Sequence, residues 1–279
     1  MTPGWILHAC QRSEDYEAFS EEGGLSIKTM HGFGTQYQVG RQLLGLNQGR
    51  YLVLNAGQPY TVQVPRGVES FCMFFSAEFT RDVYSSLSLS TDALLEGERM
   101  ASPPEFLPRT FEQPDPIAHA MERLRGWSAT GELTPERRRN GMESLLLELL
   151  YAHQMVQGEV FSYPATRHST RQDIYRRVHR ARDFLEAHLH QPITLEDLAG
   201  VANLTVFHFC RAFKHIFHCT PNAYLTHRRL ERAKWLLKHT SLSVLEVTLD
   251  VGFESPTTFS TVFKKRFGMT PTQYRSQSG

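Results

Sequence analysis

A repeat of fifty residues constrains the fold of this 279-residue chain more than any other feature. The segment LEDLAGVANLTVFHFCRAFKHIFHCTPNAYL, which starts at Leu195, aligns without a gap with LEVTLDVGFESPTTFSTVFKKRFGMTPTQYR, which starts at Leu245. The matches include three phenylalanines spaced by four, a Phe-Lys pair, a Thr-Pro pair and a tyrosine. Self-similarity at a fixed period indicates one supersecondary unit that occurs twice.

Each copy predicts a helix, a tight turn and a second helix. The first helices are predicted over Leu195–Val201 and Val244–Val251. The turns contain Asn203 or Gly252, which tolerate a left-handed backbone, and Thr205 or Ser255 then stands at an N-cap position. The second helices are predicted over Val206–Phe217 and Pro256–Phe267. This arrangement is the helix-turn-helix, whose second helix enters the major groove of DNA.

Phenylalanines spaced by four mark one face of each second helix as buried: Phe209, Phe213, Phe217, Phe259, Phe263 and Phe267. The opposite face is left for solvent or a ligand. Between the copies, Asn222–His239 is amphipathic and predicts a linker helix of roughly 20–25 Å. A stiff helix of that length suits two recognition helices held about one DNA turn, ~34 Å, apart.

The charge of the chain is divided unevenly. Residues 1–169 hold 14 Lys/Arg and 20 Asp/Glu, whereas residues 170–279 hold 16 Lys/Arg and 9 Asp/Glu. The second part therefore is the one expected to bind a polyanion.

Composition excludes several classes of protein. With 41% hydrophobic and 21% charged residues, the chain is typical of a soluble globular protein. It has no apolar run of ~18–20 residues and no signal-like N-terminus, so we expect no membrane partner and a cytoplasmic location. The four cysteines form no Cys-x-x-Cys pair, which argues against a disulfide framework or a zinc knuckle.

The N-terminal part predicts a β-rich domain, because short apolar runs alternate with glycine and proline turns. Strands are expected near Leu25–Met30, Gln36–Val39, Gln42–Leu46, Tyr51–Asn55, Tyr60–Val64 and Ser70–Phe75. Their spacing favours a barrel or sandwich. Helices are expected at Phe79–Leu87, Pro116–Trp127 and Pro135–Gln157, with a proline-rich loop over residues 101–116.

We thus predict an α+β protein of two domains. Residues 1–157 form the β-rich domain with flanking helices, residues 158–170 form a linker, and residues 171–279 form an all-α domain. Within the latter, the first helix-turn-helix spans about 193–217, the linker helix 222–239 and the second helix-turn-helix about 243–267.

Residues 173–275 resemble the DNA-binding domain of the AraC/XylS family of bacterial regulators. The resemblance rests on ITLEDLA, on TVFHFCRAFKHIFHCTPNAYL followed by RRLERAKWLL, and on VTLDVGFESPTTFSTVFKKRFGMTPTQYR. It implies that the acidic N-terminal part is a cupin-like domain that senses an effector and dimerises. His218 departs from the family, which usually has glycine after the first recognition helix.

The resemblance implies which residues contact DNA. Base contacts are expected from Val206, Phe207, Cys210, Arg211, Pro256, Thr257, Ser260 and Thr261. Phosphate contacts are expected from Thr205, Lys214, Arg228, Ser255, Lys264, Lys265 and Arg266. Because Thr261 stands where arginine is common in the family, the first recognition helix is expected to dominate specificity.

Several of these residues have an alternative interpretation. Arg211 either pairs with guanine or contacts phosphate and solvent. Phe207 either packs on thymine methyl groups or covers the core of its own unit. Cys210 is interpreted as a small apolar contact rather than a redox switch. The basic residues either meet phosphates or form a solvated face.

The N-terminal part offers weaker candidates. Tyr37, Arg41 and Tyr60 are candidate effector contacts, and the candidates to line a ligand pocket are His8, His31, Tyr37, Phe71 and Phe74. The strands lack clustered His and carboxylate ligands, so we expect no metal and no cofactor. The helix Pro135–Gln157 either forms a homodimer seam through Leu146, Leu149 and Leu150 or packs on its own domain.

The interpretation that we favour is a sequence-specific DNA-binding transcription regulator that responds to a small-molecule effector and is not an enzyme. Its expected partners are double-stranded DNA, RNA polymerase, the effector and a second copy of the chain. One alternative is a cupin-type enzyme with an appended nucleic-acid-binding tail. Another is a structural nucleoid or adaptor protein, which would bind DNA without a preferred site.

Overall fold

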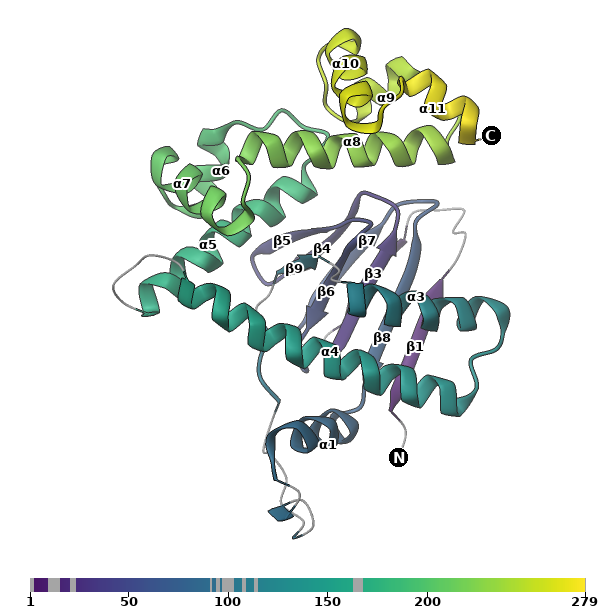
Figure 1. Ribbon diagram of the computed structural model, residues 1–279, viewed down its shortest axis with the longest axis vertical. Helices are drawn as coiled ribbons and strands as arrows, with labels where there is room; N and C mark the ends of the chain where they lie inside the picture. Colours follow the sequence, from purple (N-terminus) through teal and green to yellow (C-terminus); the bar gives the residue numbers. More distant parts are fainter. Residues whose placement is uncertain are drawn as a thin grey trace. The chain divides into compact units, whose positions relative to one another are not determined.

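The computed structural model describes residues 3–9, 16–20, 24–90, 92–93, 96, 103–106, 109–112, 115–162 and 168–278. The chain divides into two compact units, Met1–Gln172 and Asp173–Gly279. The N-terminal unit is rich in β-strands and the described part of the C-terminal unit is helical (Figure 1). This α+β organisation was predicted from the sequence.

Two antiparallel sheets build the described part of the N-terminal unit. The first has the strand order β1 (Gly4–Ala9), β8 (Glu69–Phe75), β3 (Ser26–His31), β6 (Arg50–Leu54) and β9 (Thr110–Glu112). The second has the order β2 (Tyr16–Ser20), β7 (Tyr60–Val64), β4 (Thr35–Val39) and β5 (Gln42–Leu46). The six strands that alternation predicted are β3 to β8, each within one residue of its expected bounds.

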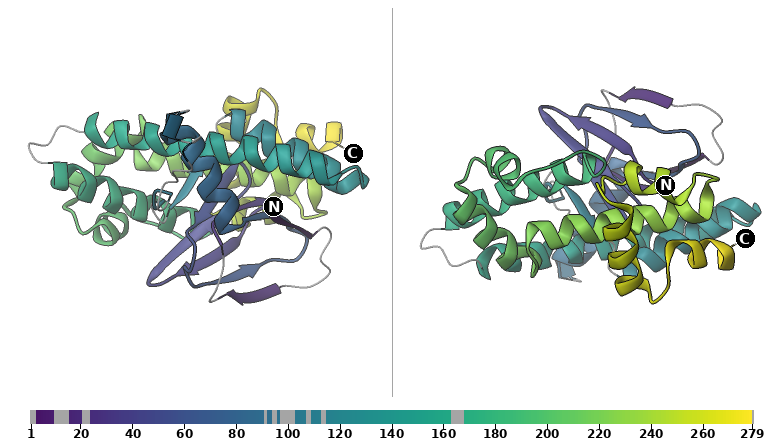
Figure 2. Two further views of the ribbon diagram at one scale, coloured as in Figure 1. Left: turned by 90° about the horizontal axis from the view of Figure 1, so that it is seen from below. Right: turned by 90° about the horizontal axis from the view of Figure 1, so that it is seen from above.

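Alternation gives the first sheet two different faces. Its inner face meets the second sheet in an apolar core that includes Met30, Tyr37, Leu44, Leu52, Val62 and Cys72. Its outer face is covered by the helices α1 (Ala77–Ser88), α3 (Asp115–Thr130) and α4 (Pro135–Ser162). Figure 2 shows α3 and α4 side by side on this face.

Three strands were not predicted: β1, β2 and β9. The strand β9 lies within residues 101–116, which we expected to be a loop. It is only three residues long and pairs with β6, where the Arg50 Nε donates to Thr110 Oγ1 at 3.0 Å. Residues 110–112 therefore form a strand because they pair with β6, which is distant in the sequence, and not because of a local sequence pattern.

The helix α4 packs on its own unit. Thr134 accepts a hydrogen bond from the Arg137 backbone at 3.2 Å, as an N-cap does, and the helix then runs to Ser162, five residues beyond its predicted end. Leu146, Leu149 and Leu150 are at most 2% exposed within the outer-face core. These three leucines, which we considered for a dimer seam, are thus occupied by the chain itself.

Seven helices form the C-terminal part of the described chain. In order they are α5 (His168–Ala187), α6 (Leu195–Ala202), α7 (Val206–Phe217), α8 (Pro221–His239), α9 (Val244–Asp250), α10 (Pro256–Phe267) and α11 (Pro271–Ser278). The predicted linker, residues 158–170, is helical at both ends, because α4 ends at Ser162 and α5 begins at His168. Residues 163–167 lie outside the described residues.

The two copies of the repeat differ by one residue in their turns, so the gapless alignment was wrong. Thr194 caps α6 through a capping box with Asp197, and Ser243 caps α9 through a capping box with Glu246. These caps are 49 residues apart, whereas the second helices α7 and α10 begin 50 residues apart. The second turn therefore contains one extra residue, and the Leu195–Leu245 match is out of structural register.

Candidate nucleic-acid interface

Each second helix starts at the hydroxyl residue predicted from the sequence. The Thr205 Oγ1 accepts a hydrogen bond from the His208 backbone at 3.3 Å, and the Ser255 Oγ accepts one from the Thr258 backbone at 3.4 Å. In α10 the first helical residue is Pro256, which has no N–H to leave unpaired. These caps fix where the exposed face of each helix begins.

The phenylalanine stripes anchor both second helices. Phe209, Phe213, Phe259 and Phe263 have no exposed surface. In the second copy the stripe packs with α8 and α9 in one core, which also contains Val247 and Val251 of the first helix and its cap. In the first copy the stripe reaches α8, because the Phe213 and Tyr224 rings lie 5.7 Å apart. With one face fixed, the other face of each helix points away from the core.

Two of the four residues of α7 that are expected to contact bases are well exposed on its outward face. Phe207 is 70% exposed and Arg211 is exposed, while Val206 and Cys210 are partly exposed. Phe207 therefore does not cover the core of its unit. Within the described part of the chain, the Arg211 guanidinium has no hydrogen bond or ion pair. Desolvation and the charge of Glu196 raise the pKa of the Cys210 thiol, which keeps it neutral.

The outward face of α10 carries hydroxyl groups rather than cations at its start. Pro256, Thr257 and Thr261 are exposed, and Ser260 is partly exposed. The Thr261 hydroxyl donates to the Thr257 carbonyl at 2.9 Å, so its oxygen remains able to accept. This face can accept hydrogen bonds from base edges and contact methyl groups.

Exposed cations follow on both second helices. Lys214 lies in the last turn of α7, and Lys264, Lys265 and Arg266 lie in the last turn of α10. All four are exposed, and none forms an ion pair with another described residue. Cations without a carboxylate partner are available to a polyanion.

Arg228 differs from these cations. Its side chain is only 12% exposed, and its Nε lies 2.7 Å from Glu186 Oε1, a carboxylate with no exposed surface. The Tyr224 hydroxyl donates to the same oxygen at 2.7 Å. Arg228 thus joins α8 to α5 inside the domain, so the expectation that it contacts phosphate was wrong.

Two other arginines also form hydrogen bonds within the C-terminal domain. Arg180 of α5 donates to the carbonyl of Val201 through Nε at 3.0 Å. Arg229 of α8 donates to the carbonyl of Leu189 at 2.9 Å and to that of Gln191 at 2.7 Å. We did not predict these bonds, because nothing in the sequence pairs an arginine with a carbonyl 21 to 40 residues away. Part of the basic excess of this unit is therefore already engaged in bonds within the domain.

Residues 198–277 match the family described as "Helix-turn-helix domain". The chain is 36% identical over 98 residues to the lactose operon transcription activator of Staphylococcus xylosus, covering 35% of each chain. It is 37% identical over 95 residues to the transcriptional regulator Rob of Salmonella typhimurium, covering 34% of this chain and 33% of that protein.

The C-terminal unit is an AraC/XylS-type DNA-binding domain. A solved transcriptional regulator from Chromobacterium violaceum, described as containing an AraC-type DNA-binding domain, aligns with 27% identity and a TM-score of 0.35. That alignment covers 40% of this chain and 97% of the other. The chain spans about a third of the length of the curated relatives that it matches.

The N-terminal unit does not bring all three effector candidates together. Tyr37 is 2% exposed and Tyr60 is half-buried, and their rings lie 5.6 Å apart in the core between the sheets. Arg41 is exposed and follows Gly40 at the turn between β4 and β5. Phe74 packs against the inner core, whereas Phe71 belongs to the outer one.

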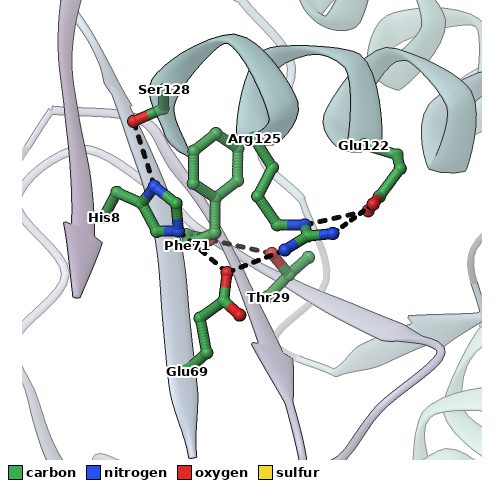
Figure 3. Close-up of polar contacts among 7 residues, drawn as sticks. All are labelled: His8, Thr29, Glu69, Phe71, Glu122, Arg125 and Ser128. Atoms are coloured by element: carbon green, nitrogen blue, oxygen red, sulfur yellow. Dashed lines mark hydrogen bonds and ion pairs between the residues drawn. The ribbon is translucent and has the colours of Figure 1, made fainter. Parts of the chain in front are cut away.

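His8 belongs to a polar network on the outer face of the first sheet (Figure 3). Its Nδ1 lies 3.0 Å from Ser128 Oγ, and its Nε2 lies 2.8 Å from Glu69 Oε1. Arg125 of α3 donates to the same Glu69 oxygen at 3.0 Å and also pairs with Glu122. Burial raises the pKa of Glu69, but the hydrogen bonds from His8 and Arg125 outweigh it and the pKa is lowered.

This network ties α3 to the sheet and does not line the inner face. No nucleophile–base pair is evident in the sequence, yet Ser128, His8 and Glu69 form a continuous hydrogen-bonded chain. His31 also lies on this face, since it pairs with Glu69 across the strands. The candidate pocket residues are therefore divided between two faces: His8, His31 and Phe71 lie on the outer face, whereas Tyr37 and Phe74 lie in the inner core.

Two further findings concern the described residues. Within them, no three His, Cys, Asp or Glu side chains are placed to hold a metal ion together. No helix among them combines the length and the apolar character of a membrane span.

One inward residue was missed altogether. Lys28, in the strand SIKTMH, is 1% exposed on the inner face of β3. A lysine at an inward position of an alternating strand is the sequence signal that identifies it.

Proposed function

We propose that this chain is a sequence-specific DNA-binding transcription regulator. The observation that carries the proposal is the pair of second helices, each held by a buried phenylalanine stripe and each with an exposed outward face. A helix fixed in this way can enter the major groove without unpacking its domain. The AraC/XylS-type domain and the relatives described as transcription regulators support the same function.

The proposed roles of the residues of α7 and α10 in DNA binding follow from their exposure and charge. Val206, Phe207, Cys210 and Arg211 of α7 and Pro256, Thr257, Ser260 and Thr261 of α10 contact bases. Thr205, Lys214, Ser255, Lys264, Lys265 and Arg266 contact phosphates. Phosphate neutralisation gives most of the affinity, and the base contacts give the sequence preference.

The N-terminal unit is proposed to be a cupin-like domain that binds an effector and alters DNA binding or the recruitment of RNA polymerase. Its support is the core between two sheets, where Tyr37 and Tyr60 lie close together. A homodimer that uses α4 would need residues other than its buried leucines, such as the exposed Tyr151. Function in the cytoplasm is part of the same proposal.

Selection of full-length protein on random DNA, with bulk DNA as competitor at moderate salt, tests this function. We expect a defined sequence motif to be enriched. The Arg81→Ala variant is a matched control, because Arg81 is an exposed cation of α1 in the other unit, and it should enrich the same motif. Binding without any preferred sequence would instead favour a structural nucleoid protein.

A further inference from the structure

Lys28 is a buried cation on the inner face of the first sheet. It pairs with Leu52 of β6 on one side and with Cys72 of β8 on the other, and it is 1% exposed. Within the described part of the chain, its Nζ has no hydrogen-bond partner. Burial of an ammonium group without a counter-charge opposes folding, so its presence at this position needs a reason other than stability.

The contacts that Nζ does make are with aromatic faces. It lies 3.4 Å from the centroid of the Phe74 ring and 5.3 Å from that of Tyr60. Such cation–π contacts offset part of the lost hydration but satisfy no N–H donor. Burial lowers the pKa of Lys28 to about 8, although Cys72 opposes this shift, so most of the group is still charged at pH 7.

An apolar row connects Lys28 with solvent. Across the strands, Leu7 pairs with Cys72 and Trp5 pairs with Phe74, so these side chains share the inner face with Lys28. Trp5 stacks on Phe74 with ring centroids 3.6 Å apart. Yet Trp5 is 53% exposed and Leu7 is 38% exposed. The edge at β1 is therefore reached by solvent, while Lys28 lies two strands further in.

We propose that this inner face binds a small organic anion, with its carboxylate on the Lys28 ammonium and its apolar body against the Tyr60 ring and the edge of Phe74, which Trp5 holds in place by stacking. Carboxylate oxygens accept charge-assisted hydrogen bonds from an ammonium group, and flat apolar groups stack on aromatic faces. A neutral ligand leaves the charge uncompensated, and a cationic ligand is repelled. The regulatory meaning of this site rests on the proposed function, whereas the binding itself does not.

Calorimetric titration of the full-length protein with phenylacetate tests the proposal, with the neutral phenylacetamide as the matched ligand. We expect phenylacetate to bind at least tenfold more tightly than the amide. The Lys28→Met variant should bind phenylacetate at least tenfold more weakly, and Lys238→Met, which removes an exposed lysine of α8, should bind it like the wild type. Trp5→Ala should weaken both ligands.

Thermal unfolding shows whether the Lys28→Met variant is folded, so that a loss of binding can be told apart from misfolding. Because Lys28→Met removes a buried unpaired charge, its melting temperature should equal or exceed that of the wild type. Equal affinity for acid and amide would overturn the proposal, as would unchanged phenylacetate binding by a folded Lys28→Met variant. So would failure of the wild type to bind phenylacetate.

The two proposals fail separately. Phenylacetate binding through Lys28 in a protein that selects no DNA motif would leave the anion site in place and overturn the regulatory function. Selection of a DNA motif by a protein that binds no carboxylate would support the regulatory function and overturn the anion site.

Discussion

His218 ends α7 in the left-handed backbone conformation in which Gly268 ends α10. The angle φ is 57° at His218 and 78° at Gly268. In this region a β-carbon crowds the backbone, whereas glycine carries no such penalty. The first recognition helix thus ends with strain that the second one avoids, at the position where the sequence departs from the family.

We therefore expect His218→Gly to stabilise the protein. Relief of the strained backbone outweighs the greater freedom of glycine in the unfolded chain, so the free energy of unfolding should rise by about 0.5–1 kcal/mol. Urea unfolding of the full-length protein measures it. The reciprocal change, Gly268→Ala, has open space around the new β-carbon and should be destabilising through backbone strain alone. A loss of stability in His218→Gly contradicts this account.

Arg228→Ala should act on stability and not on the salt dependence of DNA binding. It removes the ion pair of the Glu186 carboxylate, which has no exposed surface, and loss of this buried charge partner costs about 3 kcal/mol of unfolding free energy. Urea unfolding and a salt titration of DNA affinity measure the two effects. Lys214→Ala is the comparison, because its exposed cation should show the opposite pattern.

Lys264→Ala should weaken binding to every DNA sequence by a similar factor. Loss of one phosphate contact lowers the slope of log affinity against log salt by about 1. Fluorescence anisotropy on a selected site and on an unrelated duplex, each at several salt concentrations, gives this slope. A change on the selected site alone would mean that Lys264 reads bases.

Lys28 should make stability depend on pH in the alkaline range. Its pKa is lowered from 10.5 to about 8 in the folded protein, so the folded state resists protonation and the penalty is present below pH 8. At pH 7 Lys28→Met should therefore be more stable than wild type by about 3 kcal/mol.

That difference should shrink as pH rises from about 8 to 10.5, where the unfolded chain also loses the proton. Urea unfolding of both proteins across this range measures it. Lys238→Met should show no such trend. A constant difference between Lys28→Met and wild type would show that the lysine is not a buried cation.

The C-terminal helices could be predicted because their ends depend on local chemistry. Thr205 and Ser255 cap their helices with their own side chains, and the phenylalanine stripes are visible as a spacing of four. The register of the repeat was wrong because the alignment matched the identical residues Leu195 and Leu245 instead of the N-cap residues of the two first helices. Comparing Thr194 with Ser243 would have revealed the extra residue in the second turn.

The features that could not be predicted from the sequence depend on contacts between residues that are distant in the chain. Arg228 looks like any exposed basic residue in the sequence, and only the fold brings it to Glu186, 42 positions earlier. The same holds for the Ser128–His8 contact, which joins residues 120 apart. Alternation placed β3 correctly, but the significance of Lys28 appears only once the neighbouring strands surround it.

The most direct test of the central claim asks whether α7 and α10 each read a separate block of one DNA site. Random-sequence selection with wild type, Arg211→Ala and Thr257→Ala, each as the full-length protein, provides it. We expect a motif of two blocks about one helical turn apart, with Arg211→Ala relaxing one block by about 1–3 kcal/mol per base step and Thr257→Ala altering the other. Identical motifs from all three proteins, or no motif from the wild type, would contradict the account.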